Sequence, residues 1–212
     1  MSQTLTKKKA AAKSKASTPS MNPEGWHVSY TAMADGNKEE CVRAEEIIFR
    51  YKEGMCDRVL AYLDVLHEGE RAEQVDRYEH SLQTATRALR DGQNDEIVVA
   101  GLLHDIGDAL SSYNHGEFAA AMIRPFVSPN VHWLIANHGV FQGYYYFHFM
   151  GKDRNEREKF RGHPAYQLTV DFCEKYDQNS FDPNYDTMPL SAFEPVARRL
   201  MAREPWGSHT KV

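Results

Sequence analysis

Six histidine and aspartate residues follow one another along the chain in a pattern suited to holding metal ions. They are His80, His104, Asp105, His115, His138 and Asp177. Neutral imidazoles and ionised carboxylates suit iron, manganese or zinc, and one carboxylate can bridge two cations because it carries two oxygens on one carbon. Six ligands are too many for one small ion that keeps an open coordination position, but they suit two ions. We therefore predict a dinuclear metal site.

The adjacent pair His104 and Asp105 is the most informative part of this pattern. It follows the apolar run VVAGLL and precedes Gly107, where a helix is expected to end. The helix dipole favours a histidine at a helix C-terminus but disfavours an aspartate there. A bound cation explains both residues, whereas an ordinary helix end explains only the histidine. We assign His104 and Asp105 to the catalytic centre.

Helices must position these residues, because apolar residues recur mostly at helical spacing from about residue 40 onward and strand-like runs are scarce. We expect an all-α architecture. Antiparallel helices joined by short loops can aim side chains into one space, which would place the metal site in the core of a helical bundle. The expected helices lie within residues 36–69 (two helices), 73–92, 94–110, 114–126, 128–139 and 163–183.

The ends and faces of these helices are predicted as well. Asn94 or Asp95 caps the helix that leads to the His-Asp pair, and Ser128 caps the helix that carries His138. Gly139 is expected to end that helix. The two helices within residues 36–69 should have apolar faces formed by Val42, Ile47, Ile48, Tyr51, Val59, Leu60, Leu63 and Leu66.

The first 25 residues differ from the rest of the chain. They contain five lysines, one acid and many Ala, Ser, Thr and Pro residues, which cannot form an apolar face. We expect a disordered arm at residues 1–25, either a solvated tail or a segment that binds polyanions, and a single helical domain at residues 26–212. The arm has no apolar central segment of the kind a secretory signal needs, so we expect an intracellular, cytoplasmic protein.

Composition argues against several classes of protein and site. Without the arm the chain keeps 20 of its 25 basic and 29 of its 30 acidic residues, and the resulting net charge of −9 makes specific nucleic-acid binding unexpected. No apolar run approaches the roughly 20 residues that span a bilayer, so no membrane partner is expected. The three cysteines, Cys41, Cys56 and Cys173, include no CxxC pair. The metal ligands must therefore be histidines and carboxylates.

The motifs YEHSLQTATRA, VVAGLLHDIGD, NHGEFAAAMIRPF and VHWLIANHG, followed by Asp177, resemble the HD-domain superfamily of metal-dependent proteins over about residues 70–180. The ordered ligand series is similar to that of a dinuclear branch of mixed-valent diiron oxygenases. That branch includes myo-inositol oxygenase and the oxygenase that cleaves 2-amino-1-hydroxyethylphosphonate. The resemblance implies an HD-type bundle with an Fe²⁺/Fe³⁺ pair. One iron would be held by His80, His104 and Asp177 and the other by His115 and His138, with Asp105 as the bridge.

The resemblance leaves the substrate open. Asp108 stands where the inositol oxygenase has a lysine, and Gln142 lies where phosphonate oxygenases have a basic residue after the fourth histidine. We expect instead a small polar molecule with hydroxyl or amine groups, since aromatic faces attract cationic groups. The candidate substrate-binding residues are Asp108, Gln142, Tyr144 and His163. The aromatic run that contains Tyr144 fits a core or rim position equally well.

Two enzymatic activities fit such a site. A diiron oxygenase would oxidise the substrate with O₂ and needs no organic cofactor. A phosphohydrolase would hold Mn²⁺, Mg²⁺ or Zn²⁺ and direct hydroxide at a nucleotide or another phosphate ester. Arg124 and the segment GKDRNEREKFRG (151–162) would have to supply the basic residues that receive the phosphate. We favour the oxygenase, and a catalytically silent binding scaffold ranks last because no expected ligand is missing.

Overall fold

The computed structural model describes residue 22, residues 24–69 and residues 72–211. The lysine-rich arm predicted at residues 1–25 lies almost entirely outside the described residues, and its binding of polyanions stays a prediction. The chain divides into two compact units, Met1–Gly54 and Met55–Val212, and this division falls inside the domain predicted at residues 26–212. All six predicted metal ligands belong to the second unit.

The first unit contains the short 3₁₀ helix η1 (Met33–Asp35) and helix α1 (Lys38–Glu53). Asn37 caps α1, because its side chain accepts a hydrogen bond from the backbone amide of Glu40. No residue of α1 is buried. Three residues of its predicted apolar face are exposed, namely Val42, Ile48 and Tyr51. The described part of this unit has no second long helix against which that face could pack.

The second unit is built from helices. Its α-helices are α2 (Met55–Tyr62), α3 (Arg77–Arg90), α4 (Asp95–Leu103), α5 (His115–Ile123), α6 (Pro129–Tyr146), α7 (Tyr166–Phe172) and α8 (Glu194–Met201). Seven short elements join them: the 3₁₀ helices η2 (Leu63–His67), η3 (Arg124–Phe126), η4 (Phe147–Met150), η5 (Glu156–Phe160), η7 (Leu190–Ala192) and η8 (Ser208–Thr210), and the π-helical turn η6 (Cys173–Asp177). No strand occurs among the described residues, which confirms the predicted all-α fold.

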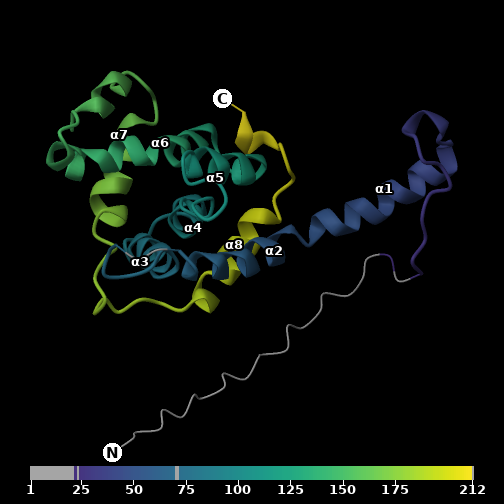
Figure 1. Ribbon diagram of the computed structural model, residues 1–212, viewed down its shortest axis with the longest axis horizontal. Helices are drawn as coiled ribbons and strands as arrows, with labels where there is room; N and C mark the ends of the chain where they lie inside the picture. The colour runs from purple at the N-terminus through teal and green to yellow at the C-terminus, as the bar shows by residue number, and fades with distance from the viewer. Residues whose placement is uncertain (1–21, 23, 70–71, 212) are drawn as a thin grey trace, which may run out of the picture. The chain divides into compact units, whose positions relative to one another are not determined.

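Helix α4 lies in the middle of the second unit, where it contacts α3, α6 and α8 (Figure 1). Every residue from Ile97 to Leu103 is buried, and the sequence is apolar around the whole helix, as is typical of a helix enclosed by others. Asn94 caps it by accepting a hydrogen bond from the amide of Ile97. Gly101 lets α3 come close, because a Cβ there would lie 3.0 Å from the backbone nitrogen of Ala85.

Two predicted helix boundaries differ from the observed ones. Helix α6 does not end at Gly139 but continues to Tyr146. A glycine ends a helix when its φ is positive, and Gly139 is not among the glycines with positive φ. Phe141 is fully buried shortly after it, so the apolar face continues past the glycine. The late helix is divided, since α7 ends at Phe172 and a π-helical turn carries the chain on to Asp177, and α8 was not predicted at all.

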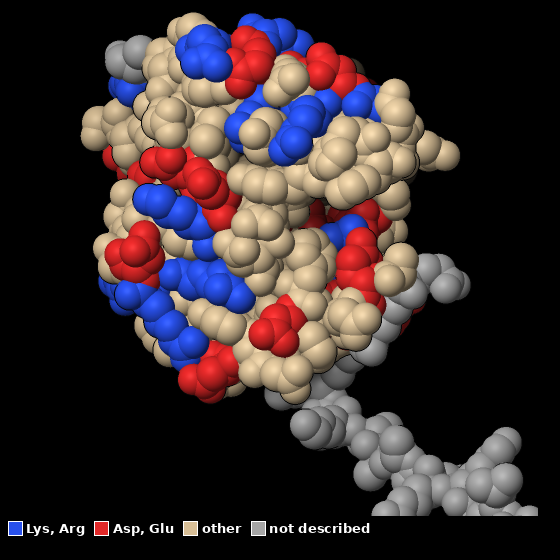
Figure 2. All heavy atoms as spheres, turned by 90° about the vertical axis from the view of Figure 1, so that its left-hand side faces the viewer, with Lys and Arg blue, Asp and Glu red and all other residues tan. Residues whose placement is uncertain are grey.

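Both signs of charge are mixed over the surface. Figure 2 shows one face of the molecule, on which groups of basic side chains are bordered by acidic ones. Some of these charges tie helices of the second unit together, as Arg198 of α8 does with Asp57 of α2 at 2.6 Å and Arg199 does with Asp95 at 2.9 Å. Within the described part of the chain, no helix combines the length and apolar character that a membrane crossing requires.

Candidate metal centre

The six predicted ligands converge on one place in the second unit. They come from the first turn of α3 (His80), the two residues that follow α4 (His104 and Asp105), the start of α5 (His115), the middle of α6 (His138) and the last residue of η6 (Asp177). Five of them are buried, and the side chain of His115 is 28% exposed. Segments far apart in the sequence thus supply one centre.

The turn after α4 directs the His-Asp pair toward α5. Helix α4 ends at Leu103, earlier than predicted, and residues 104–110 form turns. Gly107 permits a close approach to α5, because a Cβ there would lie 2.7 Å from the carbonyl oxygen of His115. This approach brings Asp105 beside the first residue of α5.

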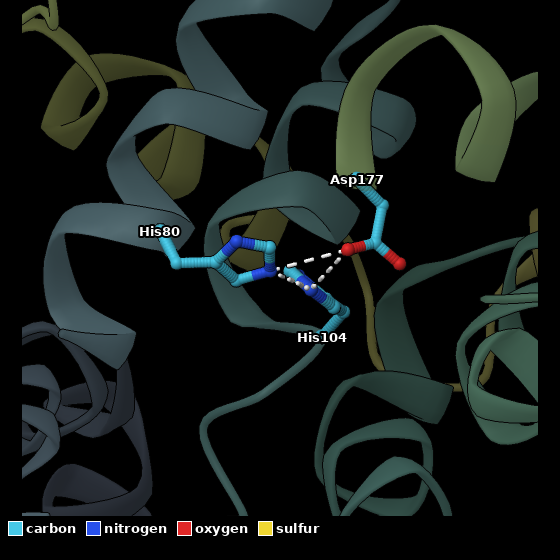
Figure 3. A group of neighbouring side chains, drawn as sticks. All are labelled: His80, His104 and Asp177. Carbon is cyan, nitrogen blue, oxygen red and sulfur yellow. Dashed lines mark hydrogen bonds and ion pairs between the residues drawn. The ribbon is translucent and has the colours of Figure 1, made fainter. Parts of the chain in front are cut away.

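His80, His104 and Asp177 form the first group of donor atoms, pointing toward one another from α3, α4 and η6 (Figure 3). Nε2 of His80 lies 3.1 Å from Nε2 of His104 and 3.1 Å from Oδ1 of Asp177. Nε2 of His104 lies 3.7 Å from the same oxygen. Each residue offers a donor atom within 4.8 Å of the others, a spacing that allows all three to bind one ion between them.

Asp105, His115 and His138 form the second group. Oδ1 of Asp105 lies 3.3 Å from Nε2 of His115 and 3.2 Å from Nε2 of His138. Its other oxygen, Oδ2, lies 3.5 Å from Nε2 of His104 and 3.6 Å from Nε2 of His80. The two oxygens of one carboxylate therefore face different pairs of histidines. A carboxylate that bridges two cations needs this arrangement.

Backbone hydrogen bonds determine which nitrogen of each histidine is free. Nδ1 of His80, His104 and His138 lies 2.9, 2.9 and 2.7 Å from a backbone carbonyl oxygen. A carbonyl oxygen only accepts, so each Nδ1 carries a proton and each neutral ring presents Nε2 as a lone pair. These lone pairs face one another and the carboxylates of Asp105 and Asp177. Because lone pairs and carboxylates repel one another unless positive charge lies between them, the donor set fits metal cations.

The same groups shift one another's pKa values. Burial alone would raise the pKa of Asp105, but the charge of His104 and hydrogen bonds from the histidines of α5 and α6 hold it well below its usual range. Burial would likewise raise the pKa of Asp177, but His104 and His80 outweigh burial and lower it. Burial lowers the pKa of His80 and His115, but the neighbouring carboxylates outweigh it and raise both. These shifts favour anionic carboxylates at Asp105 and Asp177 and positive charge beside them.

Two buried oxygens at the centre have no hydrogen-bond partner among the described residues. They are Oδ2 of Asp177 and Oε1 of Gln142. The amide nitrogen of Gln142 donates to Oδ1 of Asp177 at 2.9 Å, so Gln142 directly supports a metal ligand. An unpartnered buried acceptor is costly, which makes each oxygen a good partner for a cation or for a donor on a bound molecule. This is a second observation that fits metal binding here.

A cavity of about 420 Å³ opens beside the ligands, within the size range of sites for small molecules. Its walls include Asp108 and Gln142, two of the predicted substrate-binding residues. Aromatic side chains from Tyr145, Tyr146 and Phe181 also line it. The cavity thus combines metal ligands, polar groups and aromatic rings, as substrate sites commonly do.

The other two predicted substrate-binding residues, Tyr144 and His163, do not line this cavity. The guanidinium groups of Arg154 and Arg157 cover the ring of Tyr144 at 4.1 and 3.7 Å from its centroid. The ring of His163 stacks on Trp133 with centroids 4.0 Å apart. None of residues 151–162 lines the cavity either. The basic segment that would receive a phosphate in the hydrolase interpretation is therefore not brought to the cavity.

Sequence reasoning missed the charged residues at the mouth of the cavity. Arg77 lies 3.5 Å from Asp105, 3.5 Å from Asp108 and 3.7 Å from Glu73, measured between its guanidinium nitrogens and their carboxylate oxygens. It stands three residues before His80, so the two share a face of α3, and this spacing is the signal by which it could have been found. Burial would lower the pKa of Arg77, but these three carboxylates, together with Asp177, outweigh burial and raise it.

Residues 77–177 match the family model described as the HD domain, and this segment contains all six ligands. This segment is therefore similar to the HD domains, a superfamily of metal-dependent hydrolases and oxygenases. It agrees with the two overlapping sets of close donor atoms that could hold a metal ion, which are His80, His104 and Asp177, and His104, Asp105 and His138. No curated protein matches the chain.

Proposed function

Taking the HD-domain match as the premise, we propose that the protein is a dinuclear iron oxygenase that uses O₂ to oxidise a small polar molecule with hydroxyl or amine groups. The observation that carries the proposal is the position of Asp105, whose two oxygens face two different pairs of histidines at 3.2 to 3.6 Å. With Asp177 it provides the two carboxylates and four imidazoles expected of a pair of ions rather than of one.

The charge of the cavity supports oxidation over phosphate-ester hydrolysis. Arg77 is the one lysine or arginine among the described residues that line it, and it already faces three carboxylates. Glu73 and Asp108 add negative charge beyond that of the metal ligands. A phosphate ester would gain little from such walls, whereas a polyol or an amino alcohol would find acceptors for its hydroxyl and ammonium protons.

Each residue at the cavity has a role in this proposal. Asp108 and Oε1 of Gln142 accept hydrogen bonds from the substrate and orient it, while Gln142 also holds Asp177 in position. Phe181 stacks on His80 at 4.5 Å between centroids and, with Tyr146, limits the access of water. Bound iron would supply the one-electron chemistry with O₂ that no side chain can provide.

Hydrolysis of a phosphate ester by a Mn²⁺, Mg²⁺ or Zn²⁺ centre is the second candidate. The observation that favours it is Arg77, whose guanidinium stands 3.5 Å from the bridging carboxylate and could turn to a phosphate oxygen instead. In that case the metal ions would supply a water of lowered pKa, and the same six residues would hold them.

Parallel activity measurements separate the two candidates. Protein loaded anaerobically with Fe²⁺ is mixed with a panel of polyols, amino alcohols and hydroxylated aminophosphonates while O₂ uptake is followed. A second sample loaded with Mn²⁺ is mixed with nucleotides and sugar phosphates while phosphate release is followed. We expect substrate-dependent O₂ uptake that the Asp105→Asn variant loses. Phosphate release without O₂ uptake would replace the oxygenase with the hydrolase.

A further inference from the structure

A second, smaller polar cavity lies at the C-terminal end of α3, away from the metal ligands. Its volume is about 260 Å³, and its lining consists of Arg87, Arg90, Asp91, Lys175, Tyr176 and Tyr185. Three of these six residues are cationic and one is acidic, although the chain as a whole is acidic, with a formal net charge of −5. None of the six lines the 420 Å³ cavity.

The positive charge in this second cavity is incompletely neutralised. No ion pair within 4.0 Å is found for Arg87 or Lys175 among the described residues, and Nε of Arg87 is buried without a hydrogen-bond partner. Arg90 forms an ion pair with Asp186, but this pair is weak because the side chain of Asp186 is 93% exposed. The carboxylate of Asp91 already accepts hydrogen bonds from two other side chains.

Contacts with Tyr185 and with the backbone hold the arginine side chains of this cavity in place. The guanidinium of Arg87 lies 3.9 Å from the ring centroid of Tyr185, and that of Arg90 lies 5.4 Å from the same centroid. Arg87 also donates to the carbonyl oxygen of Asn179 at 2.8 Å. These contacts hold two guanidinium groups, about one helical turn apart on α3, beside the ammonium of Lys175.

We propose that this second cavity binds a small phosphate-bearing anion. Guanidinium groups match the geometry of phosphate oxygens and form charge-assisted hydrogen bonds with them, and the ammonium of Lys175 adds a third positive charge. The cavity, about 260 Å³ in volume and open to solvent, admits a small anion such as inorganic phosphate, pyrophosphate or a short phosphate ester.

The proposed anion site is separate from the metal centre and does not depend on the reaction catalysed there. Arg87 follows His80 by seven residues, which corresponds to about 10 Å along a helix. The backbone after η6 connects the two sites. Lys175 lies in η6 two residues before Asp177. The carbonyl oxygen of Asn179 accepts a hydrogen bond from Arg87, and that of Ser180 accepts one from His80.

Calorimetric titration of the full-length, metal-loaded protein with inorganic phosphate and with pyrophosphate tests the proposal. Lys175→Gln and Arg90→Gln change exposed side chains, so both variants should fold, and each should weaken binding by at least about tenfold. Arg87→Gln should weaken it at least as much, with the melting temperature measured to check folding. Lys159→Gln, which changes an exposed lysine elsewhere, should bind as the unmodified protein does.

His104→Ala serves to exclude phosphate binding at the metals. The proposal expects His104→Ala to bind phosphate normally while losing metal. It would be overturned if no saturable binding occurred, if His104→Ala abolished binding, or if Lys175→Gln and Arg90→Gln both bound phosphate as tightly as the unmodified chain.

Discussion

Replacing Asp177 by asparagine should empty one metal position and leave the other filled. The asparagine side chain would keep the size of the aspartate and could still accept the hydrogen bond from Gln142, now 2.9 Å long. It would lack the negative charge and the free anionic oxygen, Oδ2, that the aspartate offers. The first group would retain His80, His104 and one oxygen of Asp105, whereas the second group would lose none of its donors.

The size of the effect follows from the number of donors lost. Changing a residue that merely supports a ligand typically costs 10- to 100-fold in metal affinity, so removing a charged ligand should cost at least about 100-fold. After dialysis against a metal buffer, elemental analysis should find two ions per unmodified chain and about one per Asp177→Asn chain. Asp186→Asn makes the same chemical change at a 93% exposed position and should retain two.

Asp105→Asn completes this comparison, because the bridge belongs to both groups and its loss should deplete both ions. Two ions bound at undiminished affinity in Asp177→Asn would refute the assignment of Asp177. Loss of both ions from that variant would show that the donors act as one site and not as two.

Three further variants test the supporting structure. Gly101→Ala forces α3 away from α4 and should lower the free energy of unfolding by about 1–3 kcal/mol, measured by urea denaturation, with weaker metal binding. Glu96→Gln removes the carboxylate charge that pairs with Arg203 and accepts hydrogen bonds from Ser128. Burial opposes the lowering of the Glu96 pKa, but these partners outweigh it. The stability lost near pH 7, about 1–2 kcal/mol, should therefore shrink as the pH falls below the ordinary glutamate pKa and vanish below the lowered one. His163→Ala should leave metal content and O₂ uptake unchanged, because this ring lines no part of the 420 Å³ cavity.

The convergence of these six residues could be predicted because each of them carries its own chemical signal. A histidine and an aspartate at a helix end, with further histidines on the next helices, can be recognised without coordinates, and the order of the helices follows from apolar spacing. Asn94 could be predicted as a cap for the same local reason, and its side chain accepts from Ile97 as expected. These features depend on short stretches of chain.

Other features depend on contacts between distant segments and could not be predicted. Gly139 resembles a helix stop, but burial of Phe141 carries α6 onward past it. Tyr144 and His163 lie at plausible sequence positions, yet their rings pack against arginine and tryptophan side chains away from the cavity. Arg77 reaches the carboxylate of Asp105 across 28 residues of sequence, a contact that depends on the packing of α3 on α4.

Electron paramagnetic resonance of anaerobically purified, partly oxidised protein tests the central claim most directly. We predict two irons per chain and the signal of a magnetically coupled Fe²⁺/Fe³⁺ pair, which Asp105→Asn should abolish because it removes the bridge between the two groups of histidines. Isolated iron at one site, or two Mn²⁺ or Mg²⁺ ions in protein purified without added metal, would contradict the proposed diiron oxygenase.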